Sequence, residues 1–426
     1  MPASAAFEDK IRAVLPDVVA RFGTPFHLYD AEGIHQTCDA FNQAFSSLRF
    51  REYFAVKALP NPAVLGLLTG HGFGLDCSSL PELTLASQIG ARGHDICFTS
   101  NNTSRAEFAA AAASGALVTV DDEAVLPKLG TVPEALCLRV NPGPIAHRRR
   151  DAFLGSPESA KFGVRIDRLP LACARARDMG VRSFGLHMML GSNSLSPEPM
   201  LFALDLLLEQ LDLLAAHLGV AVDFLNLGGG IGIPYRPEEL PFDLPALGAA
   251  LRQRLDAWRP PDDGQRPAIY LECGRFVTGP HGVLVTRVVN RMSKWREYVG
   301  VDASMNALMR PAIYASAYHH ITAPFAEGRR HEVVDVVGSL CENNDRFAEQ
   351  RDLPALAEGD LLVIHDTGAH GHSMGFTYNG RLRPQELLLH ADGSVERIRR
   401  AETEQDLFAT LAFPPEQLKP KAASGI

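Results

Sequence analysis

Several features are scarce in this 426-residue chain, and each absence excludes a class of protein. Its seven cysteines are odd in number and include no Cys-x-x-Cys pair, so neither a disulfide framework nor a zinc site is expected. No apolar run approaches the roughly 18 residues of a membrane helix. Residues 1–23 contain acids where a secretory signal would be apolar. We therefore expect a cytoplasmic protein without a metal centre and without membrane contact.

An excess of positive charge is missing too. Lys and Arg number 41 against 50 Asp and Glu, and the formal net charge of −9 argues against a nucleic-acid partner. The basic run 147–150 is expected to be a solvated loop rather than a binding patch. With 46% hydrophobic and 21% charged residues the chain is typical of a soluble globular protein, and its length predicts two domains.

Short β-rich runs alternate with helical patterns from residue 50 to residue 272, which predicts parallel β/α units with right-handed crossovers. Eight such runs over about 225 residues favour a closed (β/α)8 barrel. An open doubly wound sheet is the alternative, but no run is followed by the Gly-x-Gly-x-x-Gly of a dinucleotide site. The runs are 50–56, 73–77, 95–98, 117–120, 135–140, 181–187, 221–227 and 268–272.

The pattern changes after about residue 276, where strand-like runs follow one another with few long helices between them. This change predicts a second, mainly β domain, and the early run 25–29 is a candidate to join it. The expected domains are a barrel at 29–276 and a β domain at 277–420, joined by the N-terminal segment 1–28.

Charged and glycine-rich groups stand at the ends of the strand-like runs, where the active sites of barrels form. Lys57 closes the first run, where burial would lower its pKa and favour an amine nucleophile. Each group alone is more often a surface lysine, a turn, a salt-bridge partner or a core histidine. Their joint order on successive strands is what indicates a catalyst. The later groups are Asp76, Arg139, His187, the glycines 228–230, Glu272 and Arg275.

Four motifs in this order resemble the fold-type III pyridoxal-phosphate decarboxylases. That group includes diaminopimelate, ornithine and arginine decarboxylases and shares its fold with alanine racemase. The resemblance runs from about residue 25 to residue 395 and implies a barrel with a second, mainly β domain. The motifs are YFAVK at 53–57, DCSSLPE at 76–82, LGGG at 227–230 and ECGR at 272–275.

The resemblance implies pyridoxal 5'-phosphate as cofactor, held by Lys57 as a Schiff base. It also implies that Glu272 keeps the pyridine nitrogen protonated, so that the ring accepts the electrons released when CO2 leaves. Anion-binding amides and an arginine would hold the phosphate. The other cofactor-binding residues that it implies are Asp76, Arg139, His187, Met189, Ser192, Gly229, Gly230, Arg275 and His370.

Three segments after residue 300 resemble diaminopimelate decarboxylases in particular. They are MRPAIY at 309–314, CENND at 341–345 and HDTGAH at 365–370, the last followed by a Tyr-Asn pair. The activity so implied is conversion of meso-2,6-diaminopimelate to L-lysine and CO2 in lysine biosynthesis. The Cys-Glu loop of this family reaches the partner's barrel, which implies a homodimer with shared sites.

The same resemblance implies roles around the substrate. Cys341 would return a proton to the α-carbon, and Glu342 would meet the distal ammonium. The paired, planar donors of arginine suit a distal carboxylate. The residues implied to bind substrate are Arg275, Arg310, Tyr314, Glu342 and Tyr378.

The sequence departs from the family pattern at three positions. Met189 stands where the family has a histidine stacked on the cofactor, and His187 lies two residues earlier on the same strand face. His370 replaces a tyrosine and could titrate near neutral pH. Cys273 replaces a proline. These changes bear more on the identity of the substrate than on the cofactor.

Other readings remain open at this level. The substrate could be another basic amino acid or a carrier-linked aminoacyl group. An amino-acid racemase would need a tyrosine base in place of the Cys341 loop, and the CENND segment argues against it. A non-catalytic homologue should have lost the lysine or the phosphate-binding groups, and this chain keeps Lys57, Ser192, Gly230 and Arg275.

Overall fold

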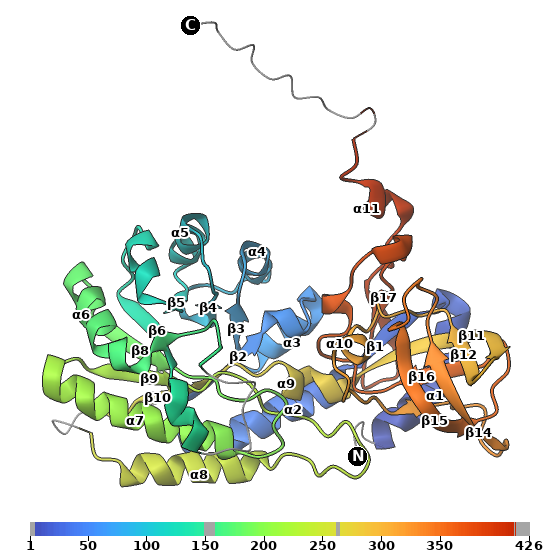
Figure 1. Ribbon diagram of the computed structural model, residues 1–426, viewed down its shortest axis with the longest axis horizontal. Helices are drawn as coiled ribbons and strands as arrows, with labels where there is room; N and C mark the ends of the chain where they lie inside the picture. Colours follow the sequence, from blue (N-terminus) through green and yellow to red (C-terminus); the bar gives the residue numbers. More distant parts are fainter. Residues whose placement is uncertain (1–4, 149–157, 261–264, 413, 415–426) are drawn as a thin grey trace, which may run out of the picture.

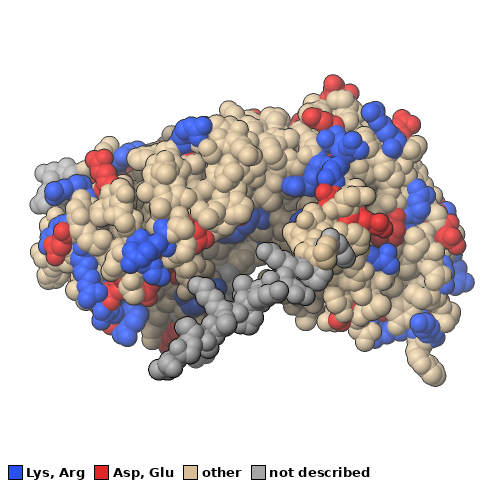
Figure 2. Space-filling view, turned by 90° about the horizontal axis from the view of Figure 1, so that it is seen from above, with Lys and Arg blue, Asp and Glu red and all other residues tan. Residues whose placement is uncertain are grey.

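The computed structural model describes residues 5–148, 158–260, 265–412 and 414. Two parts lie side by side along the long axis of the molecule, a helix-covered barrel and a mainly β domain (Figure 1). The side chains of the whole basic run 147–150 lie outside those that the structure describes. Basic and acidic side chains are interspersed on the face drawn in Figure 2.

Eight parallel strands close into a ring in the order β2-β3-β4-β5-β6-β8-β9-β10, with β10 returning to β2. Each strand coincides with one of the eight runs expected from the sequence, so the prediction of a closed barrel is confirmed. The short β7 (Val164–Arg165) pairs only with β6. The barrel strands are β2 (Phe50–Ala55), β3 (Gly74–Cys77), β4 (Ile96–Thr99), β5 (Leu117–Val120), β6 (Ala135–Asn141), β8 (Ser183–His187), β9 (Val222–Asn226) and β10 (Ala268–Leu271).

Helices cover the outside of this ring (Figure 1). Their ends carry the expected capping residues: Asn61 accepts the amide of Ala63, and Ser104 and Glu107 form a capping box. Glu82 accepts the amide of Ser78 at 2.7 Å, so this acid of the DCSSLPE motif supports its own helix. The helices are α2 (Ala31–Ala44), α3 (Pro62–Gly70), α4 (Leu80–Gln88), α5 (Arg105–Ser114), α6 (Leu169–Met179), α7 (Glu198–Leu218) and α8 (Leu244–Ala257).

The second part is a mixed sheet in the order β15-β14-β12-β11-β1-β17-β18, with β16 paired to β11 and β13 to β16. The early strand β1 lies in its middle, between β11 and β17. The strands are β1 (Phe26–Asp30), β11 (Gly282–Ser293), β12 (Glu297–Val301), β13 (Ile321–Thr322), β14 (His331–Val337), β15 (Arg346–Pro354), β16 (Leu361–Ile364), β17 (Gln385–Leu389) and β18 (Val395–Arg399).

Helix α1 (Ala5–Phe22) packs on this sheet rather than on the barrel. Its buried side chains Phe7, Ile11 and Leu15 form one cluster with Val283 and Leu387. The domain limits 29–276 and 277–420, with segment 1–28 as part of the β domain, stay our proposal. Among the residues described, every helix is too short or too polar to cross a lipid bilayer.

Candidate active site

Lys57 follows β2 on a short turn of 3-10 helix, at the carboxyl end of the barrel strands. Its Nζ lies 3.9 Å from Oδ2 of the buried Asp76, at the end of the neighbouring β3. The expectation that Lys57 is buried is wrong, because 57% of its side chain is exposed. The strand ends one residue earlier than predicted, and the amine therefore stands free in a cavity rather than inside the apolar core.

The β domain holds the segment that carries this lysine. The amide of His370 donates to the carbonyl of Ala58 at 2.9 Å, and Arg399 donates to the carbonyl of Pro60 at 2.9 Å. Glu386, buried in β17, accepts a bond from Asn61 at 3.1 Å and pairs with Arg399. These contacts were not predicted from the sequence, although the charged Glu386 within an apolar strand was a signal for them.

Glu272 lies on the floor of the cavity, held by three neighbours. Its Oε1 accepts bonds from Thr99 Oγ1 at 2.9 Å and Asn226 Nδ2 at 2.7 Å, and its Oε2 lies 3.2 Å from Nε2 of His187. Burial raises the pKa of Glu272, but His187, Lys57 and Asn226 outweigh it and bring the pKa to about 2. Glu272 is therefore a buried anion.

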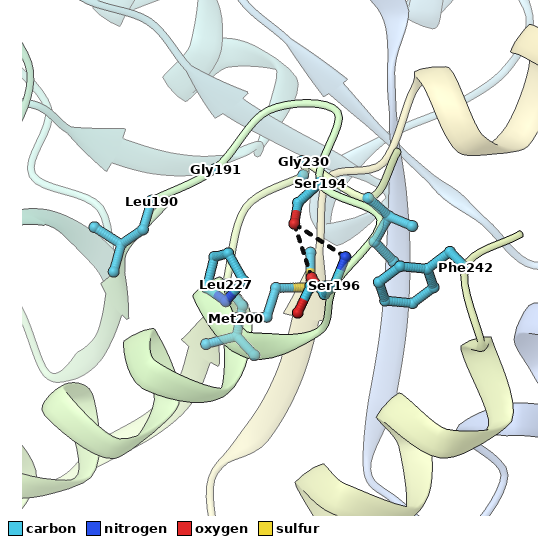
Figure 3. A pocket seen from close by; sticks show the side chains of 11 residues that line it. Leu190, Gly191, Ser194, Ser196, Met200, Leu227, Gly230 and Phe242 are labelled. Carbon is cyan, nitrogen blue, oxygen red and sulfur yellow. Dashed lines mark hydrogen bonds between the residues drawn. The ribbon is translucent and has the colours of Figure 1, made fainter. Parts of the chain in front are cut away.

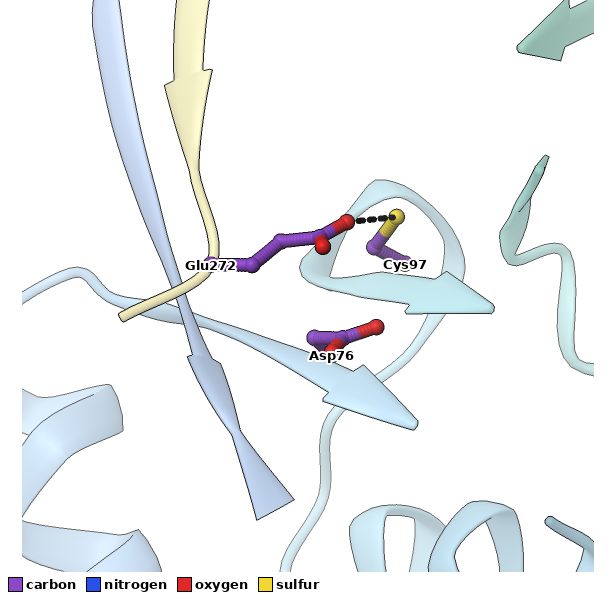
Figure 4. Close-up of side chains that lie close together, drawn as sticks. All are labelled: Asp76, Cys97 and Glu272. Carbon is purple, nitrogen blue, oxygen red and sulfur yellow. Dashed lines mark hydrogen bonds between the residues drawn. The ribbon is translucent and has the colours of Figure 1, made fainter. Parts of the chain in front are cut away.

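Asp76 and Cys97 lie beside this anion, and the three side chains point toward one another (Figure 4). Burial, and then the charge of Glu272, raises the pKa of Asp76 well above its ordinary value. One acid of the pair is thus charged while the other holds a proton, because two adjacent buried carboxylates repel each other. Asp76 Oδ1 and His187 Nδ1 are buried without a hydrogen-bond partner among the described residues.

Two loops form a backbone cradle after β8 and β9. The amide of Ser194 donates to the carbonyl of Gly230 at 2.9 Å, and the amide of Gly232 donates to Ser194 at 2.8 Å. Gly230 has a φ of +103°, and a side chain there would meet the carbonyl of Gly191 at 2.4 Å. Within the described part of the chain, the amides of Gly229 and Gly230 make no hydrogen bond. Such free amides suit an anion.

Apolar side chains close the far side of this cradle. The Ser194–Ser196 turn is surrounded by Leu190, Met200, Leu227 and Phe242 (Figure 3). Within this turn, Ser194 Oγ donates to the carbonyl of Ser196 at 2.8 Å. Ser192, at the mouth of the cradle, lines the cavity of Lys57.

The cavity on this side measures about 250 Å³ and has a strongly basic wall. Arg275, Arg310 and Tyr314 line it together with Ser192 and Gly230. The buried Tyr235 lies behind the arginines, with its ring centroid 3.8 Å from Cζ of Arg310 and its hydroxyl accepting a bond from Arg275. No side chain among the residues described forms a salt bridge with either arginine.

A second, wider cavity of about 920 Å³ opens on the other side of Lys57. Arg139 lines it, stacked at 4.4 Å over the ring of Phe162 and 3.6 Å from Asp121. Met189 and Glu272 line both cavities, and His187 lines the wide one. His187 thus lies deeper than Met189, bonded to Glu272 rather than free to face a ligand.

His370 lines the smaller cavity in a left-handed backbone conformation, with a φ of +58°. The expectation that it titrates near neutral pH is wrong. Burial, followed by the charges of Arg275, Lys57 and Arg310, lowers its pKa to about 3. His370 is a neutral imidazole in this site.

Three of the residues implied to act on substrate lie outside both cavities. Cys341 and Glu342 are exposed, and 53% of Tyr378 is exposed. The amide of Cys341 donates to Oδ1 of Asn379 at 2.8 Å, which ties this loop to the Tyr-Asn pair. Within one chain, the structure does not bring these residues to Lys57.

This chain is similar in sequence and in structure to proteins of one known family. Residues 31–279 match the family described as pyridoxal-dependent decarboxylase, pyridoxal binding domain. The chain is 49% identical to Protein TabA of Pseudomonas amygdali pv. tabaci, over 97% of each chain. It is 35% identical to the diaminopimelate decarboxylase of Methanothermobacter thermautotrophicus, over 95% of each. The crystal structure of the M. jannaschii diaminopimelate decarboxylase with L-lysine superposes with a TM-score of 0.85 at 28% identity, covering 93% of this chain and 94% of that one.

Proposed function

This chain belongs to the pyridoxal-dependent decarboxylases, and from that premise we propose that it converts meso-2,6-diaminopimelate to L-lysine and CO2, as a step of lysine biosynthesis. The relatives named diaminopimelate decarboxylase support this substrate, and so does the L-lysine complex among the similar structures.

The observation that carries the proposal is the pair of arginines beside Lys57. Arg275 and Arg310 line one cavity with this lysine, and neither forms a salt bridge among the described residues, although the charge of the buried Asp366 acts on Arg310. Two guanidinium groups that face one cavity and form no salt bridge there can take up an anion, and their planar donors suit a carboxylate. A substrate with a second carboxylate, distal to the reacting carbon, meets that need.

Pyridoxal 5'-phosphate is the cofactor of this family, and the site fits it. Glu272, a buried anion, would face the pyridine nitrogen, and Lys57 would hold the cofactor through its amine. The free amides of Gly229 and Gly230 would hold the phosphate with Ser192 and Arg275. When bound, the cofactor supplies an electron sink for the pair released with CO2.

Other groups of this chain would shape the cavity around the cofactor. Asp76 would stay protonated beside Lys57, and Met189 would pack against the ring face through its polarisable sulfur. Arg139 would border the ring from the wide cavity, His187 would act through Glu272, and His370 would offer a neutral imidazole from the β domain.

Proton return needs a second chain in this proposal. Cys341 and Glu342 are exposed and lie outside the cavities of their own chain, which is the arrangement expected of a loop that enters a partner's site. We propose a homodimer in which Cys341 of one chain delivers the proton to the α-carbon bound at Lys57 of the other. Glu342 and Tyr378 would contact the distal end of the substrate from the same surface.

A second candidate is decarboxylation of a larger amino acid or a carrier-linked aminoacyl group. The cavity of about 920 Å³ beside Met189 favours it, because this volume is near the upper end of ordinary ligand pockets. The 49% identity to Protein TabA, whose name states no reaction, leaves this candidate open.

Substrate profiling by CO2 release tests the proposal. We expect meso-2,6-diaminopimelate to release CO2 while L-lysine, L-ornithine and L-glutamate release far less, because they lack the matching distal carboxylate or its spacing. Release from another substrate with none from diaminopimelate would replace the first candidate by the second.

A further inference from the structure

We propose that Tyr235 is a specificity-determining residue, which holds Arg275 and Arg310 on one phenol ring so that both present the same free edge to a distal carboxylate. The inference rests on the proposed function, since it assumes that the arginines bind the substrate. It adds a residue that touches no part of the reaction centre and acts through its two neighbours.

Tyr235 is buried, with 3% of its surface exposed, in the loop that follows the glycine cradle. Arg310 lies over its ring face at 3.8 Å, well within the range of a cation–π contact. Nη1 of Arg275 donates to its hydroxyl, and Cζ of Arg275 lies 5.7 Å from the ring centroid. One side chain thus holds both guanidinium groups without contributing a negative charge.

His319 completes the support of Arg310. Its ring lies 5.0 Å from that of Tyr235 at an angle of 72°, and its Nδ1 donates to the carbonyl of His365 at 2.7 Å. Burial, and then the charge of Arg310, lowers the pKa of His319 to about 3, so its Nε2 keeps a lone pair. Nη1 of Arg310 lies 3.4 Å from that atom and donates to the carbonyl of Tyr318 at 3.2 Å.

Each of the two arginines is therefore held through its own Nη1 atom. Their Nε and Nη2 atoms have no hydrogen-bond partner in the part of the chain that the structure describes, and they are not among its buried unsatisfied atoms. The Nε–Nη2 edge is the one that grips a carboxylate with two parallel bonds. Arg165 uses that edge on Asp167 in this protein, at 3.0 and 2.6 Å.

A neutral ring suits this task better than an acid. An Asp or Glu at this place would also orient the arginines, but it would neutralise the charge that attracts the substrate. The phenol ring fixes direction and leaves the charge of both groups available. Substrates without a distal carboxylate gain nothing from this arrangement, which makes Tyr235 a determinant of selectivity.

The test measures binding of pimelate, a seven-carbon dicarboxylate that has no amino group to react. Calorimetry on the holoenzyme would compare the wild type with Tyr235→Phe and Tyr235→Leu. We expect Tyr235→Phe to weaken pimelate binding several-fold, because it removes the hydroxyl that accepts a bond from Arg275 and keeps the ring under Arg310. Tyr235→Leu should weaken it more than tenfold, because it frees both arginines.

Tyr53→Phe is the matched control. Tyr53 is also buried, donates its hydroxyl to the carbonyl of His94 at 3.0 Å and lies under Arg51 at 5.2 Å, yet it lines neither cavity. Pimelate binding in this variant should equal that of the wild type. If Tyr235→Leu does not fold, judged by circular dichroism, Tyr235→Phe decides the outcome.

Wild-type affinity in both Tyr235 variants would overturn the inference, and so would a wild type that does not bind pimelate. The proposed function is tested separately by CO2 release. A wild type that binds pimelate through Tyr235 but releases no CO2 from diaminopimelate would support the role of Tyr235 and reject only the substrate.

Discussion

Nε2 of His187, on β8, lies 3.2 Å from Oε2 of Glu272, at the end of β10. Together with Lys57 and Asn226, this imidazole holds the pKa of the acid at about 2 despite its burial. The contact explains why an ionised carboxylate persists on the floor of the barrel.

Replacing His187 by Leu should raise the pKa of Glu272. In the wild type the folded-state pKa of about 2 lies below the ordinary 4.5, so ionised Glu272 stabilises the fold above pH 4.5, and this contribution is lost as pH falls toward 2. In His187→Leu the gap between the folded-state pKa and the ordinary pKa narrows, so less stability should be lost as pH falls below 4.5. Urea unfolding between pH 3 and pH 7 measures the difference.

The control for that experiment is His71→Leu, since His71 lies 3.2 Å from Asp39 outside the site. If the free energy of unfolding falls equally with pH in the wild type and in His187→Leu, His187 does not set the charge of Glu272.

Glu52 and Cys273 form a second buried pair under the site. The amide of Cys273 donates to Oε1 of Glu52 at 2.5 Å, while Oε2 of Glu52 is buried without a partner. Glu52→Leu should lower the free energy of unfolding by about 1–3 kcal/mol, because it leaves a buried amide unpaired. In a Cys273→Pro background, where residue 273 has no amide hydrogen, Glu52→Leu should lower the free energy of unfolding by less. Equal losses in both backgrounds would rule out this hydrogen bond as the cause.

The protonation state of Glu52 gives a separate prediction. Burial raises the pKa of Glu52 well above its ordinary value, so its contribution is complete below pH 4.5 and is lost as pH rises toward the folded-state pKa. Glu52→Gln keeps the acceptor and cannot ionise. We expect its stability to fall less than that of the wild type between pH 5 and pH 9, as measured by urea unfolding.

Arg310→Met should weaken the use of diaminopimelate. A distal carboxylate left without one guanidinium loses a charge-assisted bond, and we expect kcat/KM to fall by about tenfold or more. Arg287→Met is the control, because Arg287 donates to the carbonyl of Gly359 and lines neither cavity. Steady-state kinetics with both variants check this, and an unchanged kcat/KM in Arg310→Met would remove the distal-carboxylate assignment.

Mixing two inactive variants tests the proposed dimer. Lys57→Ala and Cys341→Ala chains, unfolded together and refolded, should recover up to about a quarter of wild-type activity, because a mixed dimer has one intact site. Each variant refolded alone is the control. No recovery in the mixture would mean that Lys57 and Cys341 act within one chain or that Cys341 is not required.

The sequence predicted the barrel because its strands are short apolar runs that alternate with helical patterns. It also predicted that Asp76, His187 and Glu272 lie at one rim, since the parallel strands of a barrel all end there. Strands β15 and β18 lack the apolar pattern that predicts a strand, because polar residues interrupt it.

The supporting residues could not be foreseen in the same way. Tyr235, His319 and Glu386 act through contacts between segments far apart in the chain, and local pattern carries no information about such contacts. The exposure of Lys57 and the neutrality of His370 likewise depend on how the β domain covers the barrel mouth.

Borohydride reduction of the holoenzyme, followed by peptide mapping, tests whether Lys57 carries the cofactor. We expect a pyridoxyl group on the peptide that contains Lys57 and none in Lys57→Ala. A wild-type digest with that peptide unmodified, or with the group on another lysine, would contradict it.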